Sequence, residues 1–145
     1  MMPQRFMSKL DTHQIQFDKD RTITVKVVDE AAMVSPYLAE LKSLIGTSTA
    51  VGLSVRYAPY ADRSLLADSR YPSMLQLSVG TRFLLIQLRR LDSIPECLKE
   101  FLADPEICFV GVSSTRFARR MLKTYCEIEL TNGIDVSDLA AKVLN

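Results

Sequence analysis

The chain has 145 residues, 48% of them hydrophobic, and a formal net charge of +1 at pH 7. This length and apolar content suit one packed domain, and the near-neutral charge excludes a global field that attracts nucleic acid or membranes. No apolar run approaches the roughly 20 residues that span a bilayer, and residues 1–14 lack the apolar segment of a signal peptide. Three cysteines without close pairs predict a reduced, intracellular protein, nuclear or cytoplasmic.

The N-terminal part predicts a β-hairpin followed by a helix. Apolar and polar residues alternate in HQIQF (13–17) and TITVKVV (22–28), and the polar DKDR between them suits a turn. In the following SPYLAELKSLIG, Ser35 can cap a helix, Pro36 suits the first helical position, and Gly46 suits its end.

The middle of the chain predicts a strand, a loop and a second hairpin. The alternating sequence AVGLSVR predicts a strand over 50–56. Residues 58–73 are rich in Pro, Ser and Arg, and they predict a long loop. The sequence MLQLSVGTRFLLIQL (74–88) predicts a hairpin that turns at Gly80 and Thr81.

The C-terminal part alternates between helices and strands. We expect helices over 95–103 and 115–125, a buried strand over 107–112, a short strand at EIEL (127–130), and a last helix over 135–145. Antiparallel hairpins that are followed by alternating helices and strands are typical of a mixed sheet flanked by helices. The fold class is therefore α/β.

The order of these pieces resembles the Werner-type 3′–5′ exonuclease domain, which has the ribonuclease H-like fold of the proofreading exonucleases. The motifs are VGLSVRYAP, LQL leading into FLLIQL, and FLADP leading into FVGV. The N-terminal hairpin and first helix resemble the plant branch of that family. The resemblance implies one domain over 13–145 after a tail of residues 1–12. It also implies a central strand 50–56, with hairpin 74–88 on one side and a parallel strand 107–112 on the other.

The resemblance identifies the positions of a metal site. The family cleaves phosphodiesters with two Mg²⁺ or Mn²⁺ ions, held by three aspartates and one glutamate. The positions of its Asp-x-Glu pair are Ser54 and Arg56 here, and its helix aspartate corresponds to Phe117. The helix with the last aspartate and its tyrosine falls beyond Asn145. We therefore expect a pseudoenzyme with a C-terminally truncated fold, no metal cofactor and no catalytic residues.

A basic stripe follows the predicted helix 115–125 at spacings of three and four residues. It consists of Arg116, Arg119, Arg120 and Lys123. Phe117 and Met121 lie on the opposite face and are expected to pack in the core. Because guanidinium groups bind phosphate by paired hydrogen bonds, the stripe and Arg56 form a candidate nucleic-acid site. A solvated helix face is the simpler alternative.

Three functions stay open on the sequence alone. The first is an inactive exonuclease-like domain that acts as a protein-interaction or regulatory module, as a homo-oligomer or with a protein partner such as an active relative. The second is a nucleic-acid binder, and the third is an active 3′–5′ exonuclease completed by acids from another chain. No membrane partner is expected. The absent C-terminal helices favour the first, because they should leave apolar surface of the sheet or of the helix 115–125 open. We expect the interface to involve a sheet edge or the helix 136–144.

Overall fold

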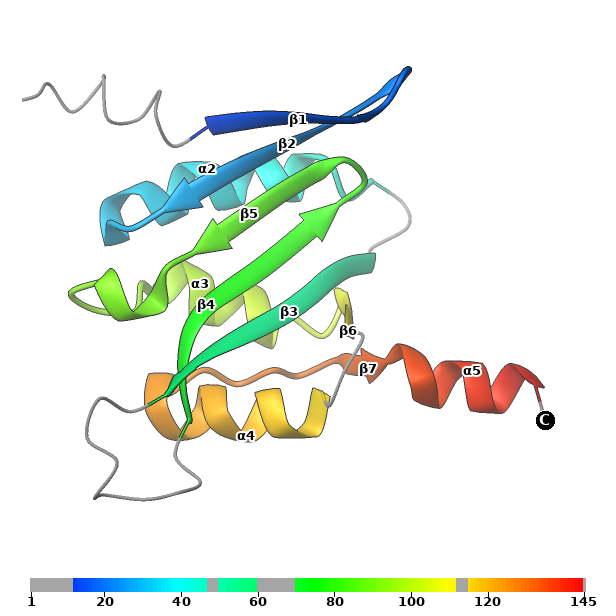
Figure 1. Ribbon diagram of the computed structural model, residues 1–145. Helices are drawn as coiled ribbons and strands as arrows, with labels where there is room; N and C mark the ends of the chain where they lie inside the picture. The colour runs from blue at the N-terminus through cyan, green and yellow to red at the C-terminus, as the bar shows by residue number, and fades with distance from the viewer. Residues whose placement is uncertain (1–11, 47–49, 60–69, 112–114, 145) are drawn as a thin grey trace, which may run out of the picture.

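The computed structural model describes residues 12–46, 50–59, 70–111 and 115–144 (Figure 1). Its elements are β1 (Thr12–Asp18), β2 (Arg21–Val28), α2 (Ala31–Ser43), β3 (Ala50–Pro59), β4 (Arg70–Val79), β5 (Arg82–Ile86), the 3₁₀ turn η1 (Leu88–Arg90), α3 (Glu96–Ala103), β6 (Cys108–Gly111), α4 (Thr115–Cys126), β7 (Gly133–Asp135) and α5 (Val136–Leu144). The predicted tail of residues 1–12 lies outside the described residues, except for Thr12 at the start of β1. The extent of the predicted single domain stays a prediction.

The described strands form one seven-stranded mixed sheet in the order β1-β2-β5-β4-β3-β6-β7. As predicted, β3 lies inside the sheet, antiparallel to β4 and parallel to β6. The hairpin of β4 and β5 turns at Gly80 and Thr81, as expected. Gly80 has a φ of +58°, a left-handed conformation that glycine adopts without a steric penalty. The prediction of a mixed α/β sheet is confirmed.

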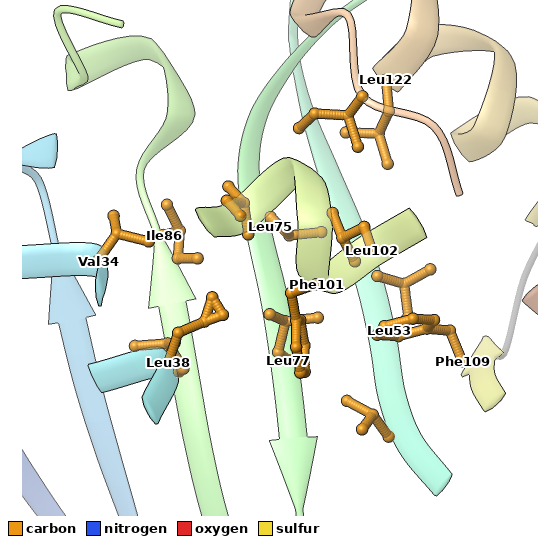
Figure 2. Close-up of a cluster of buried hydrophobic side chains, with 14 of the residues drawn as sticks. Val34, Leu38, Leu53, Leu75, Leu77, Ile86, Phe101, Leu102, Phe109 and Leu122 are labelled. Atoms are coloured by element: carbon orange, nitrogen blue, oxygen red, sulfur yellow. The ribbon is translucent and has the colours of Figure 1, made fainter. Parts of the chain in front are cut away.

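The hydrophobic core lies between one face of the sheet and helices α2, α3 and α4. Figure 2 shows Leu38 of α2, Phe101 of α3 and Leu122 of α4 among the side chains of a single cluster. Alternate residues of the strands point into this cluster, among them the fully buried Leu77 and Phe109. The rings of Phe101 and Phe109 meet edge to face, with centroids 5.4 Å apart. The core therefore depends on contacts between the central strands and the short helix α3.

The opposite face of the sheet carries the remaining side chains of the same strands, and we call it the outer face. From the strand register, it includes His13, Ile15, Ile23, Val25, Val27, Ala50, Gly52, Ser54, Arg56, Met74, Gln76, Ser78, Phe83, Leu85, Cys108 and Val110. In Figure 1 this side of β2, β5 and β4 faces the viewer, with α2 and α3 behind the strands. No described helix covers it there.

The predicted start of the first helix is wrong. The helix α2 begins at Ala31, and Pro36 stands inside it rather than at its first position. A proline at this place removes one backbone hydrogen bond. Extending the helix toward its N-terminus puts Val34 into the core, fully buried, and this burial offsets the lost hydrogen bond.

The predicted loop 58–73 is wrong at both ends, because β3 continues to Pro59 and β4 begins at Arg70. Two contacts fix the added strand ends. The rings of Tyr71 and Tyr125 pack with centroids 4.7 Å apart, and the Ser73 hydroxyl donates a hydrogen bond of 3.0 Å to the Arg56 carbonyl. The rest of the loop, residues 60–69, lies outside the described residues.

Two shorter predictions also need correction. The second hairpin ends at Ile86, before η1, and not at residue 88. The strand expected at 127–130 is irregular chain, and β7 follows it at Gly133–Asp135. Ile128 and Leu130 alternate into the core like strand residues. However, the Ile128 amide bonds to the Leu122 carbonyl at the end of α4, so it makes no strand ladder.

Candidate functional site

Ser54 and Arg56 lie on the outer face of β3 and are exposed to solvent. Since neighbours in a strand alternate, Leu53 and Val55 take the core side. The register of β4 places Gln76 opposite Ser54 and Met74 opposite Arg56. The two positions therefore share one face, as their spacing predicts, and their cross-strand neighbours carry no carboxylate.

Phe117 is half-buried on α4, outside the main core cluster where the sequence placed it. Its ring meets the ring of Tyr57 edge to face, with centroids 5.0 Å apart. The guanidinium carbon of Arg120 lies 5.6 Å from the centroid of the Phe117 ring. Burial raises the pKa of the Tyr57 hydroxyl. Phe117 therefore contacts Tyr57, the residue after Arg56, and the guanidinium of Arg120 lies beside this aromatic pair.

The basic stripe of α4 is not uniformly available to a ligand. Arg119 is half-buried, and its Nε donates a 2.9 Å hydrogen bond to the Leu130 carbonyl. Lys123 forms a 2.8 Å ion pair with Glu129. Arg116 and Arg120 are exposed. Arg119 and Lys123 therefore bind the segment after α4, and Arg116 and Arg120 are exposed to solvent.

Asp135 joins two helices at the end of β7. Its carboxylate accepts hydrogen bonds from the Ser137 hydroxyl at 2.7 Å, the Ser137 amide at 3.1 Å and the Thr115 amide at 3.4 Å. The bonds from Ser137, and more weakly that from Thr115, lower the pKa of Asp135. Asp135 therefore ties the first turns of α4 and α5 together. The signal in the sequence was an aspartate one residue before an amphipathic segment, where helix caps occur.

A cleft of about 460 Å³ lies beside this junction. It is lined by Thr115, Arg116, Arg119, Gly133, Asp135 and Asp138. The Thr115 hydroxyl is buried and has no hydrogen-bond partner among the described residues. Two guanidinium groups and two carboxylates balance each other in charge here, so the cleft has no excess of either sign to select an ion.

A second basic group lies beside Met74, the cross-strand partner of Arg56. A cleft of about 470 Å³ is lined by Ser73, Met74, Gln87, Arg89 and Arg90. Met74 pairs directly with Arg56 across β4 and β3, so η1 brings Arg89 and Arg90 to the same end of the outer face. Both are exposed. Arg89 and Arg90 were not predicted as a site, although two adjacent arginines after a predicted strand are a visible signal in the sequence.

The family's two metal ions do not fit these side chains. Mg²⁺ and Mn²⁺ need several anionic or carbonyl oxygens. Ser54 offers one neutral hydroxyl, Arg56 a cation and Phe117 a hydrocarbon ring. Among the described residues, no three His, Cys, Asp or Glu side chains cluster as a metal site would require.

None of the described helices is long and apolar enough to cross a membrane.

No protein-family model matches the chain, and no curated protein matches it. Solved structures do. The crystal structure of the EXD2 exonuclease domain has a TM-score of 0.70 and 22% identity, over 81% of this chain and 58% of that chain. The same domain soaked in Mn has a TM-score of 0.70 and 22% identity, over 81% and 59%. Soaked in Mg and GMP, its TM-score is 0.69 and its identity 20%, over 81% and 58%.

These matches confirm the ribonuclease H-like exonuclease fold that the sequence predicts. The chain spans less than two thirds of the length of the EXD2 domains it resembles. At this level of identity the likeness establishes the fold and no activity. The resemblance to the plant branch stays a prediction.

Proposed function

We propose that this chain is a non-catalytic domain of the exonuclease fold that acts as a protein-interaction module. One observation carries the proposal. The positions corresponding to three metal-binding acids hold Ser54, Arg56 and Phe117, and these have an exposed hydroxyl, an exposed guanidinium and an aromatic ring packed on Tyr57. A two-metal mechanism needs oxygen anions at these places to hold both ions against their mutual repulsion.

Arg56 works against metal binding in a second way. Its positive charge is accompanied at the same end of the outer face by Arg89 and Arg90. A cation that approaches this end meets like charges, and the interaction is repulsive at any effective dielectric constant. Recovery of activity therefore needs acids from elsewhere, which is the third hypothesis of the sequence analysis.

Incubation with labelled single-stranded DNA or RNA and Mn²⁺ or Mg²⁺ is expected to leave the strands uncut. Calorimetric titration with Mn²⁺ should show no saturable binding. The assay is run over a range of protein concentrations, because acids from a second copy could act only in an assembly. Arg56→Ala is the matched control, since removing one cation supplies no ligand and should create no activity.

Metal-dependent shortening of the strands from their 3′ ends, lost in Ser54→Ala and Arg56→Ala, would contradict this proposal. Cleavage that these substitutions leave unchanged, and that stays with the protein through further purification, would also contradict it by showing acids supplied from elsewhere. Cleavage that purification removes marks a contaminating nuclease.

The helix α5 supplies the interaction part of the proposal. None of its residues is buried. Its apolar residues recur at helical spacing and form a stripe of Val136, Leu139, Ala140, Val143 and Leu144. The exposed fractions of Leu139, Val143 and Leu144 are 48%, 75% and 83%. Contiguous exposed apolar side chains of this kind mark protein-interaction surfaces. The proposed partner is a second copy or another protein, including an active relative.

Nucleic-acid binding is a second candidate function, favoured by the exposed arginines. Arg116 and Arg120 on α4, and Arg89 and Arg90 near Arg56, point to solvent and suit phosphate oxygens. Contacts of this kind are made to the backbone of the strand and carry little sequence information. The near-neutral net charge limits such binding to these local groups.

The double substitution of Arg116 and Arg120 by alanine should weaken binding to single-stranded oligonucleotides. It should also reduce the slope of log affinity against log salt by about 1.4, because the loss of two phosphate contacts means that fewer counterions are released on binding.

Arg119→Ala should instead lower the free energy of unfolding by about 1 kcal/mol, because its hydrogen bond to the Leu130 carbonyl is lost. Fluorescence anisotropy and urea unfolding measure the two effects.

Lys123→Ala is the control, since Lys123 is already paired with Glu129. Equal affinity of wild type and the double variant, or an unchanged salt slope, would show that Arg116 and Arg120 form a solvated face.

A further inference from the structure

A cleft of about 480 Å³ lies between the start of β4, the segment around η1 and the last turn of α4. In Figure 1, η1 and the end of α4 lie at the same end of the molecule. We call it the tyrosine cleft, after Tyr71 and Tyr125, which line it. Phe117, at a position of the family's metal site, is about two turns earlier on α4.

We propose that the tyrosine cleft binds an extended segment of another protein in which a tryptophan stands next to an acidic residue. The inference rests on the proposed function, because it names the partner chemistry of that interaction module.

The lining of the tyrosine cleft suits an aromatic side chain. The rings of Tyr71 and Tyr125 lie 4.7 Å apart between centroids, with their planes tilted by 39°. Leu88 and Cys126, both buried, line the cleft as well. Burial raises the pKa of the Cys126 thiol, an effect that the charge of Lys99 opposes, so the neutral thiol acts as apolar surface. Clefts of this size and lining hold the aromatic residues that carry most of the binding energy in interfaces.

Two opposite charges in the tyrosine cleft define which aromatic side chain fits. Arg89 and Asp92 both line it and are exposed. Within the described residues, neither side chain has an ion pair or a hydrogen bond. An indole N–H only donates and a carboxylate only accepts, so Asp92 suits a tryptophan. A carboxylate beside that tryptophan suits the Arg89 guanidinium.

This charge pair favours a peptide over a nucleotide. A phosphate bound by Arg89 would share the cleft with the Asp92 carboxylate, and these like charges repel each other. A peptide that presents one N–H donor and one carboxylate matches both groups. Tyrosine is a poorer match than tryptophan, because its hydroxyl oxygen also accepts hydrogen bonds and would need a further donor.

The backbone beside the cleft can pair with an extended peptide. Asp92, Ser93 and Ile94 line the cleft and belong to no helix or strand. Their amides donate no hydrogen bond to another group of the described chain. Extended peptides gain affinity from such main-chain groups and specificity from a pocket that takes one of their side chains.

The chain itself contains no tryptophan. A second copy of this chain therefore cannot supply the proposed residue, and the partner is a different protein. The same fact makes the tryptophan of an added peptide the only one in a titration. Its fluorescence then reports directly on its own burial.

The probe is a short capped peptide with Asp-Trp at its centre and serines and threonines on both sides. Its tryptophan emission should shift to shorter wavelength and saturate when the full chain is added, with a Kd below about 1 mM. Arg89→Glu and Asp92→Asn should each weaken binding about tenfold. Arg90→Glu is the matched control, because it makes the same charge change at the next residue, which does not line this cleft. It should leave binding nearly unchanged.

A charge reversal localises the contact. A peptide with Lys-Trp in place of Asp-Trp should bind wild type weakly and should bind Arg89→Glu more tightly than wild type. Circular dichroism checks that the variants fold, as expected for substitutions at exposed positions. In amide spectra of the isotope-labelled chain, the Asp-Trp peptide should shift residues 88–94 and 125–126 and leave the outer face unchanged.

Three results overturn the inference: no saturable shift with the Asp-Trp peptide, equal weakening by Arg90→Glu and Arg89→Glu, or no gain for the Lys-Trp peptide in Arg89→Glu. A nucleoside monophosphate that shifts residues 88–94 where the peptide does not also overturns it and makes the cleft a nucleotide pocket.

The nuclease assay decides the proposed function separately. A chain that neither binds the peptide nor cleaves strands loses this cleft as a docking site and keeps the stripe of α5 as its interaction surface. A chain that binds the peptide and cleaves strands keeps the cleft and contradicts the non-catalytic function.

Discussion

Replacing Phe109 with alanine is expected to lower the free energy of unfolding by about 3–5 kcal/mol. Phe109 is fully buried in β6, between β3 and β7 in the sheet. Its ring packs edge to face against Phe101 of α3. The substitution removes the buried ring and leaves a cavity that the paired strands on both sides cannot close. Urea unfolding followed by circular dichroism measures the loss.

Ser54→Ala is the control for this experiment. Ser54 is exposed on the neighbouring strand β3, and its substitution should change the free energy of unfolding by less than about 0.5 kcal/mol. A loss below about 1 kcal/mol for Phe109→Ala would mean that β6 is not the packed interior strand described above.

Leu122→Ala should cost about 2–5 kcal/mol and should loosen α4 more than the rest of the fold. Leu122 is fully buried and, with Cys126, joins α4 to the core cluster. Since elements can open independently when their anchoring contacts are lost, amide exchange should accelerate first in residues 115–126. Hydrogen exchange read by mass spectrometry measures this effect element by element.

Thr124→Ala is the matched control on the exposed side of the same helix, and it should leave the exchange of α4 nearly unchanged. Uniform acceleration over the whole sheet in Leu122→Ala would contradict the local effect and would show that α4 unfolds only with the core.

Sequence periodicity predicted the architecture because the sheet has one buried face. Apolar residues alternate with polar ones, as in β3, where Leu53 points into the core and Ser54 points outward. The turn at Gly80 sets the register between β4 and β5. The resemblance to the exonuclease domains then ordered the strands correctly. The predicted ends of helices and strands were wrong where contacts with distant residues decide them. Burial of Val34 extends α2 beyond the expected cap, and the contact between Tyr71 and Tyr125 extends β4 into the expected loop.

The candidate site was predictable only in part. The positions of Ser54, Arg56 and Phe117 follow from motif spacing. The partners of the basic stripe do not, because Arg119 binds the carbonyl of Leu130, in a segment that was expected to be a strand. Contacts made by a single backbone carbonyl leave no periodic trace in a sequence.

The register of β2 against β5 has a consequence for the order in which the chain folds. These two strands are parallel, and Thr24 pairs with Arg82 across 82 − 24 = 58 residues. The β4–β5 hairpin closes through a two-residue turn, so its contacts are local and form on a timescale of about microseconds. β2 has no edge to join until that hairpin exists, and bringing it there closes a long loop at an entropic cost. The β1–β2 hairpin is therefore a late addition to a nucleus centred on β3, β4 and β5, and this high contact order slows its docking.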